Sequence, residues 1–121
     1  MEKVYKFKIV NVEEGKVEAL IQVDPDHPVY KGHFPSNPVT PGAVQVQMIG
    51  EVLKEHLGTD LMLCAARSIK FTAPHLPGKH GDLSLHMQVK QGSAGTYEVN
   101  ATLSGDEISY LKFRGEFRES K

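Results

Sequence analysis

The residue best placed to do chemistry is His33, which follows Gly32 in a proline-rich segment just ahead of a predicted helix. Residues 24–41 contain five prolines, which prevent both helical and ladder hydrogen bonding, so a long, shaped loop of the functional kind is expected. The helix after it offers unpaired N–H groups and partial positive charge, and Gly42 in its first turn lets a ligand approach the backbone. One interpretation is a base beside a site for a carbonyl or an anion. The other is that His33 only bonds a backbone carbonyl and fixes the loop, and the residues alone leave both open.

Hydrophobic patterning predicts the elements that hold this loop in place. A helix is expected from Pro41 to about Leu57, capped by Thr40 and stopped by Gly58, and its first half is apolar on nearly all sides, which is typical of a buried helix. Period-two alternation predicts a strand hairpin before the helix and four strands after it. These strands cover about residues 5–9, 17–23, 63–71, 83–89, 97–103 and 108–117. The order indicates an α+β architecture, an antiparallel β-sheet wrapped around one long central helix.

Length and composition restrict the class of protein. The 121 residues fit one domain, and 40% hydrophobic with 24% charged residues allow a packed core. The 14 basic and 15 acidic side chains give a net charge of -1, which leaves no excess of positive charge for a nucleic acid. No apolar stretch approaches the ~20 residues of a membrane helix, and residues 1–10 lack the apolar core of a signal peptide. The single cysteine fits a reducing compartment, so a cytoplasmic location is expected.

The other polar and reactive side chains are predicted to have structural roles. The six histidines show no paired spacing with carboxylates, so no metal site is expected. His75 and His80 are expected to be exposed in a proline- and glycine-containing turn, and His86 on a solvated strand face. Cys64 is expected to be a small core residue. Arg67 shares the otherwise apolar face predicted for residues 63–71 and is expected to pair with a carboxylate at a dimer edge.

Two motifs carry a resemblance to a known family. Residues 32–42 read Gly-His-Phe-Pro, two further residues, Pro, Val, one residue and Pro-Gly, directly before the predicted helix. Residues 69–78 contain Lys-Phe, a proline and Pro-Gly at a strand and turn. This pattern resembles the 3-hydroxyacyl-[acyl-carrier-protein] dehydratases of type II fatty acid synthesis, a branch of the hotdog-fold superfamily. The length and the element order agree across nearly the whole chain.

The resemblance implies a single hotdog domain over residues 1–121, in a homodimer or higher even oligomer with each active site between subunits. The implied substrate is a 3-hydroxyacyl thioester on the phosphopantetheine arm of an acyl carrier protein, and no metal or organic cofactor takes part. His33 would remove the proton next to the thioester carbonyl, while the backbone N–H of Gly42 holds that carbonyl. An acid from the partner helix would protonate the departing hydroxyl, which leaves a trans-2-enoyl thioester and water.

The same resemblance implies residues that contact the substrate and the carrier. The substrate contacts are expected at Phe34, Pro35, Pro41 and Ala43. An acidic carrier protein would need only a local basic patch, which is expected around Lys70, Lys79 or Arg67. The short chain has little room for both a core and a deep cleft, and a site shared between two chains removes that difficulty.

The chain departs from the family pattern at the position of the acid. The family carries Glu or Asp fourteen positions after the histidine, and this chain has Gln47 there. An amide donates a hydrogen bond but delivers no proton at neutral pH, and a positioned general acid contributes ~10²–10⁴ in rate. Glu51, one helical turn later, is either a substitute acid acting through Gln47 or a water, or, as the favoured interpretation, a solvated carboxylate pairing near Lys54.

Three functions follow from these observations. The first is a 3-hydroxyacyl-[acyl-carrier-protein] dehydratase, with its activity weakened by Gln47. The second is a catalytically impaired or partner-dependent hotdog subunit that binds acyl thioesters. The third is a hotdog thioesterase, because the same helix N-terminus can activate a thioester carbonyl for water. The Gly-His-Phe-Pro loop disfavours the third, since it supplies a base suited to proton abstraction at carbon.

Overall fold

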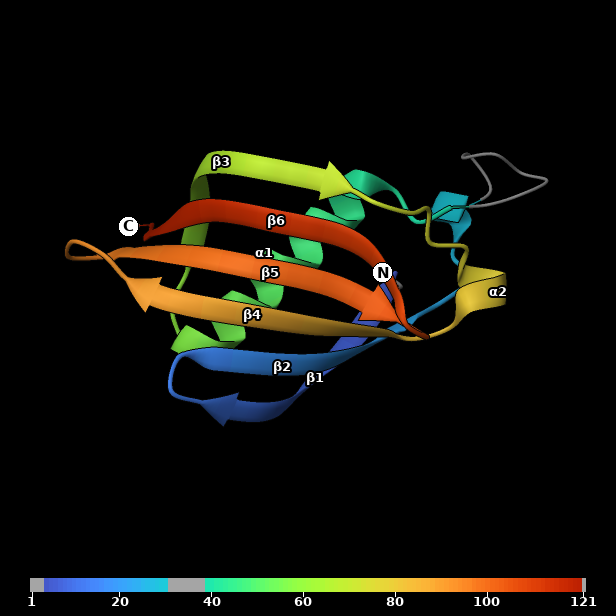
Figure 1. Cartoon of the computed structure of the whole chain (residues 1–121), viewed down its shortest axis with the longest axis horizontal. Helices are drawn as coiled ribbons and strands as arrows, with labels where there is room; N and C mark the ends of the chain where they lie inside the picture. Colours follow the sequence, from blue (N-terminus) through green and yellow to red (C-terminus); the bar gives the residue numbers. More distant parts are fainter. Residues whose placement is uncertain (1–3, 31–38, 121) are drawn as a thin grey trace.

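The chain forms one antiparallel sheet with a long helix on one side of it. The computed structural model describes residues 4–30 and 39–120. The sheet has six strands in the order β1-β2-β4-β5-β6-β3, and every neighbouring pair is antiparallel (Figure 1). The strands are β1 (Tyr5–Glu13), β2 (Lys16–Val23), β3 (Leu61–Phe71), β4 (Leu83–Gln91), β5 (Thr96–Gly105) and β6 (Ile108–Glu119). The helical elements are η1 (Pro28–Tyr30), α1 (Gly42–Leu57) and the short α2 (Pro77–His80). The predicted α+β architecture is confirmed.

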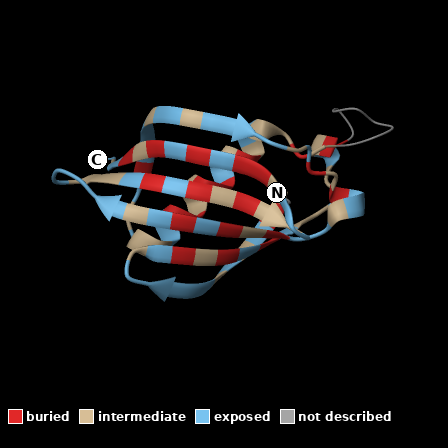
Figure 2. Ribbon diagram, viewed as in Figure 1, coloured by how far each residue is buried: buried red, intermediate tan, exposed pale blue. Residues whose placement is uncertain are grey.

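The core lies between α1 and the inner face of the sheet. Buried and exposed residues alternate along the central strands, as Figure 2 shows, so each of these strands has one face toward the helix. The helix contributes Met48, Ile49, Val52 and Leu53, all with no exposed surface. The prediction of a first half buried on nearly all sides is confirmed only for the side facing the sheet, because Ala43 is exposed and Val44 and Val46 are half-buried. None of the helices in residues 4–30 and 39–120 is long and apolar enough to cross a membrane.

The two ends of α1 differ in how they are closed. At the C-terminal end Gly58 adopts a left-handed backbone with φ 68°, and its N–H bonds the Lys54 carbonyl at 2.8 Å, so the predicted stop is confirmed. At the N-terminal end Pro41 is the cap residue and no side chain caps the helix among the described residues. The prediction that Thr40 caps the helix is therefore wrong. Its hydroxyl bonds Tyr30 and His75 instead.

Strand β3 is the edge strand that departs most from its sequence pattern. Its pairing with β6 shifts register between Leu63 and Ala65, and again between Ala66 and Ser68. Each irregularity changes which side chains face the core, so the single apolar face predicted for residues 63–71 is wrong. Only Leu61 at its start is buried. The strand exposes several large apolar side chains at 38–53% of their surface: Met62, Leu63, Ile69 and Phe71.

Candidate functional site

The N-terminus of α1 is the described part of the predicted active site. The predicted base, His33, and the predicted contacts Phe34 and Pro35 lie outside the described residues. Pro41 directly precedes the helix, and its carbonyl accepts from the N–H groups of Val44 and Gln45, at 3.1 Å each. The N–H groups of the first helical residues have no acceptor within a helix. The start of α1 therefore carries N–H donors and partial positive charge, the combination that binds anions and carbonyl oxygens.

Gly42 lies in close contact with the ring of Phe71, which would have to move to admit a larger residue. A Cβ added there would lie 2.6 Å from Cζ of Phe71, which is closer than non-bonded carbon atoms approach. Gly42 itself is half-buried, and the adjacent Ala43 is exposed. The ring of Phe71, whose residue is 53% exposed, thus lies against the start of α1. The sequence places Phe71 in the second motif but gives no sign of this contact.

Gln47 and Glu51 form a bonded pair on α1. Gln47 is exposed, and its amide Nε2 donates to Oε2 of Glu51 at 3.3 Å. Because an ionised carboxylate only accepts hydrogen bonds, Nε2 must be the atom that faces Glu51. The amide oxygen and the second N–H proton of Gln47 are then directed elsewhere. This orientation allows Gln47 to bond a substrate hydroxyl while it stays attached to Glu51.

Tyr5 on β1 holds the other oxygen of Glu51. Its hydroxyl donates to Oε1 of Glu51. Burial raises the pKa of the Tyr5 phenol far above its ordinary value, and the hydrogen bond and charge of Glu51 raise it further. Tyr5 therefore stays a donor at all physiological pH values. Glu51 is half-buried and bonded to Tyr5 and Gln47, so the favoured expectation of a solvated carboxylate pairing near Lys54 is wrong.

A buried polar cluster lies next to the helix N-terminus and consists of Tyr30, Thr40 and His75. The Thr40 hydroxyl lies 2.9 Å from the Tyr30 hydroxyl and 2.7 Å from Nδ1 of His75, and Nε2 of His75 lies 2.9 Å from the carbonyl oxygen of Gly81. His75 has no exposed surface, and burial lowers its pKa, partly opposed by the Gly81 hydrogen bond. His80 is half-buried, with Nδ1 accepting from the N–H of Leu76 at 2.9 Å. The predicted exposure of both histidines is wrong.

A basic groove of about 590 Å³ crosses the face of the sheet that points away from α1. Its charged lining residues are four bases, Lys16, Lys70, Lys112 and Arg114, and one acid, Glu18. Lys70 and Lys112 are directly opposite each other on β3 and β6, an arrangement that costs stability. None of the four bases forms an ion pair with another described residue. The rest of the chain then carries 10 basic and 14 acidic side chains, so positive charge is concentrated on this face.

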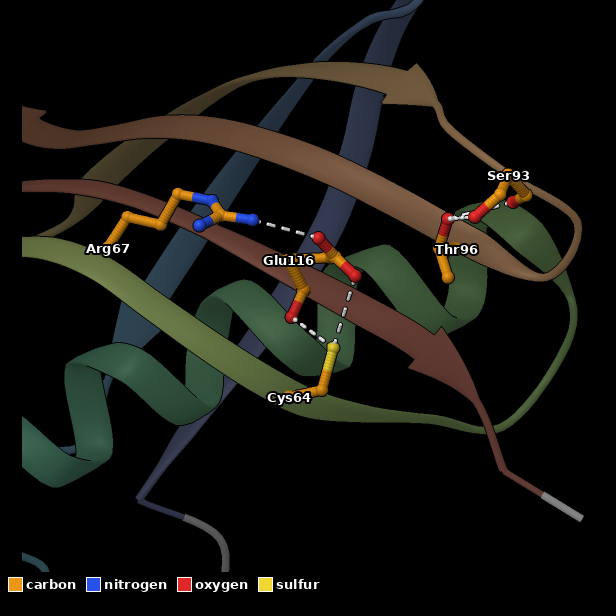
Figure 3. Close-up of polar contacts among 5 residues, drawn as sticks. All are labelled: Cys64, Arg67, Ser93, Thr96 and Glu116. Atoms are coloured by element: carbon orange, nitrogen blue, oxygen red, sulfur yellow. Dashed lines mark hydrogen bonds and ion pairs between the residues drawn. The ribbon is translucent and has the colours of Figure 1, made fainter.

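The outer edge of the sheet holds Cys64 and Arg67, which contact Glu116 of β6 (Figure 3). Arg67 pairs with the Glu116 carboxylate at 3.0 Å, and the Cys64 thiol bonds the Glu116 carbonyl at 3.3 Å. Both residues are exposed. The core position predicted for Cys64 is wrong because β3 shifts register beside it, and Arg67 has its partner within the same chain. The figure also shows Ser93 and Thr96 bonded to each other in the β4–β5 turn.

The remaining polar side chains of the described residues do not gather into another candidate site. His86 is exposed and lies 3.9 Å from Glu18, which confirms its predicted place on a solvated strand face. Within residues 4–30 and 39–120, no group of three or more histidine, cysteine or acidic side chains is placed to hold a metal ion.

Comparison with known proteins identifies a family and a fold. A family model described as ApeI-like, ApeI dehydratase, matches residues 9–113. A 3-hydroxyacyl-[acyl-carrier-protein] dehydratase FabZ from Acetivibrio thermocellus is 31% identical over 107 residues, which are 82% of this chain and 73% of that protein. The enzyme of the same name from Caldicellulosiruptor bescii is 29% identical over 109 residues, 84% of this chain and 78% of that protein.

Solved structures share the fold at low sequence identity. The dehydratase heterocomplex ApeI:P from Xenorhabdus doucetiae superposes with a TM-score of 0.77 at 16% identity, covering 98% of this chain and 100% of that one. A hypothetical thioesterase with coenzyme A from Streptococcus pneumoniae gives a TM-score of 0.69 at 12% identity, over 95% of this chain and 86% of that one. These likenesses confirm the hotdog fold and carry no activity by themselves.

Proposed function

We propose that this chain, which belongs to the ApeI-like dehydratase family, removes water from a 3-hydroxyacyl thioester held by an acyl carrier protein. The product is a trans-2-enoyl thioester. The observation that carries the proposal is the family match over residues 9–113, which spans the N-terminus of α1 and the residues expected to act there. The FabZ relatives, which are named as dehydratases of carrier-linked substrates, support the same reaction and the same substrate class.

The proposed reaction begins at the helix end. His33 takes the proton from the carbon next to the thioester carbonyl, and negative charge moves onto the carbonyl oxygen. The backbone N–H of Gly42 points from the start of α1 and stabilises that charge as it builds up. The electron pair then forms the carbon–carbon double bond while the bond from C3 to the hydroxyl oxygen breaks. The leaving hydroxide needs a proton, so a third group must act.

Gln47 and Glu51 are the two candidates for that third group. The amide of Gln47 hydrogen-bonds the departing hydroxyl but holds no proton to give at neutral pH. Glu51 lies within hydrogen-bond distance of Gln47 and is fixed by Tyr5. We propose that Gln47 orients the hydroxyl and that Glu51 is the substitute acid, directly or through a water. For this step the Glu51 carboxyl group carries a proton taken up from solvent, unlike the ionised form that accepts both hydrogen bonds, and gives it to the leaving hydroxide. His33 returns the proton that it took from the substrate to solvent. The rate is expected to be low, because the acid stands one helical turn from the position at which the family carries it.

An assay of four variants tests these roles. Hydration of a trans-2-butenoyl thioester on carrier protein is followed, which is the same reaction in reverse. We expect weak wild-type activity, its loss in His33→Ala and in Glu51→Gln, and a gain of up to about 10²-fold in Gln47→Glu. The double exchange Gln47→Glu with Glu51→Gln should be active because it moves the acid to the family position. The control is Glu55→Gln, on an exposed residue of the same helix.

Each result of this assay bears on a separate part of the proposal. Activity in no variant would overturn the dehydratase function. Full activity in Glu51→Gln would show that Glu51 is not the acid, while the loss in His33→Ala would still support the reaction. Ordinary enzyme rates in the wild type would show that Gln47 does not lower the rate of the reaction.

The edge strand β3 supports a second copy of the chain as partner. Its exposed apolar side chains, among them Met62 at 52% and Phe71 at 53%, lie on a strand whose outer edge has no neighbour among the described strands. The two register shifts of β3 already disfavour open-ended pairing, but its exposed apolar side chains still favour cover by another chain. We therefore propose a homodimer joined along β3, with each active site completed by the partner. A stable monomer in a measurement of solution mass would contradict it.

A partner-dependent subunit is the second candidate function. The observation that favours it is Gln47. A chain with no acid at this position would be active only if a different subunit supplied the acid. The same edge strand would then pair with that subunit. Activity that appears only after addition of a second hotdog chain, with none in the purified protein or in Gln47→Glu, would favour this candidate over the first.

A further inference from the structure

We propose that His75, acting through Thr40, is a positioning residue of the active site. It fixes Thr40, which bonds Tyr30 across the segment that contains His33 and precedes the start of α1. This inference rests on the proposed function, because that function makes His33 the base. The mechanism above does not use the buried Tyr30–Thr40–His75 cluster, and no local feature of the sequence requires a buried histidine at this position.

The hydrogen bonds of the cluster have one consistent direction. The carbonyl oxygen of Gly81 only accepts, so Nε2 of His75 carries the proton and donates to it over 2.9 Å. In the neutral ring Nδ1 is then an acceptor, and the Thr40 hydroxyl donates to it over 2.7 Å. The Thr40 oxygen in turn accepts from the Tyr30 hydroxyl at 2.9 Å. The chain therefore runs from Tyr30 through Thr40 and His75 to Gly81.

The cluster bonds residues on both sides of the His33 segment. Tyr30 is the last residue described before that segment, and Thr40 lies just after it, so their hydroxyl contact joins the two ends directly. The backbone N–H of Thr40 also donates to the carbonyl of His75 at 2.8 Å. Two bonds to one residue of another part of the chain fix Thr40 in both position and orientation.

The same threonine is tied to the start of α1. Its carbonyl accepts from Nε2 of Gln45, a buried side chain in the first turn and a half of the helix, at 3.1 Å. Thr40 precedes Gly42 by two residues, so its placement determines where the Gly42 N–H points. His75 thus acts through Thr40 on the position of the Gly42 N–H, the group proposed to hold the substrate carbonyl.

Burial makes this arrangement dependent on the neutral form of His75. A protonated ring would donate from both nitrogens, so Thr40 would have to turn its own proton toward Tyr30, and the chain would reverse. The groups facing His75 are the rings of His80 at 5.8 Å and Tyr110 at 5.0 Å, besides the Thr40 hydroxyl. None of them supplies a negative charge to hold a proton on the ring. Asp24 and Asp106 act on the more distant phenols of Tyr30 and Tyr110, respectively.

Substitutions at Thr40 separate positioning from simple packing. Thr40→Val keeps the shape and removes the hydroxyl, so we expect kcat to fall about 10- to 100-fold with KM changed less than about 2-fold. Thr40→Ser restores the hydroxyl and should recover most of the rate. His75→Asn, which keeps an acceptor near the position of Nδ1, should lose less activity than His75→Leu. The matched control is Tyr110→Phe, because the buried Tyr110 hydroxyl has no partner among the described residues, and its loss should leave kcat unchanged.

A second measurement keeps the test independent of catalysis. The pKa and chemical shift of the His33 ring are followed by NMR in the wild type and in Thr40→Val. A shifted His33 signal in a variant that melts as the wild type does would support positioning, even if the protein showed no dehydration at all. Unchanged kcat in Thr40→Val, or an unchanged His33 signal where no activity exists to measure, would overturn the inference. A loss of rate in Thr40→Val that Thr40→Ser does not recover would also overturn it.

Discussion

Acid is expected to destabilise the fold through His75. Burial lowers the pKa of this imidazole below its ordinary value of 6.5, and the nearby His80 lowers it further, while the Gly81 hydrogen bond acts in the opposite direction. The unfolded chain therefore binds the proton at a higher pH than the folded one. The stability linked to His75 is complete above pH 6.5, falls as the pH drops below that value and is lost below the folded-state pKa.

The size of the effect follows from one proton. In the unfolded chain His75 takes up its proton around its ordinary pKa of 6.5. If the folded chain does not take up this proton, the free energy of unfolding falls by up to about 1.4 kcal/mol between pH 7.5 and 5.5, because one pKa unit is worth about 1.36 kcal/mol. This value is an upper limit, which the loss approaches more closely the further burial lowers the pKa of His75 in the folded chain. For a small domain this is a large share of the total stability.

Urea unfolding at pH 7.5 and 5.5 measures this loss at one fixed protein concentration, because association also contributes to stability. The wild type should lose about 1 kcal/mol more than His75→Asn, which has no titrating group at that place. His86→Gln is the control, as His86 is exposed and near Glu18, and it should follow the wild type. Equal losses in the wild type and His75→Asn would refute the reasoning, because the buried ring would then not be the group that takes up the proton.

Two further predictions concern the groove and the helix end. Lys112→Glu should raise KM for a carrier-linked substrate about 5- to 10-fold at low salt and leave KM for a carrier-free thioester unchanged, because charge patches act on association with acidic partners. Lys54→Glu, the same change on α1, is the control. Equal effects of the two substitutions would refute a role of the groove in binding the carrier. Gly42→Ala should lower kcat/KM at least about 10-fold because its methyl group meets the Phe71 ring at 2.6 Å, and adding Phe71→Ala should recover part of the loss, whereas strictly additive effects would refute the contact.

Local patterns predicted the elements that depend on local causes. The period-two strands Tyr5–Ile9 and Val17–Val23 pair as the predicted hairpin, since alternation alone decides which face is buried. The stop at Gly58 was predictable because a left-handed backbone favours glycine. In β3 the alternation rule gave the wrong face. The two register shifts of this strand arise from its pairing with β6 and cannot be recognised in the composition of residues 63–71.

The site was predictable only where its residues follow one another in the chain. Gly42 and Gln47 lie on one helix, so the sequence places them relative to each other without a tertiary contact. Thr40 was assigned to the wrong partner, because the preference of threonine for helix caps is local while its actual partners lie 10 and 35 residues away. His75 has turn-like neighbours and still lies in the core, since the Thr40 and Gly81 bonds remove the cost of burying its two nitrogens.

The geometry of α1 bears on whether one chain can hold a complete site. Gly42 and Gln47 are five residues apart, which places them about 140° apart around the helix axis and about 7.5 Å apart along it. Gly42 lies at the end of the helix beneath Phe71 of β3, whereas Gln47 is exposed on the side, tied through Glu51 to Tyr5 of β1. The two groups thus face different elements of the same chain. A substrate bound at the Gly42 N–H would meet Gln47 more readily from a second helix packed across the β3 edge, which is the reason for proposing that the partner completes each site.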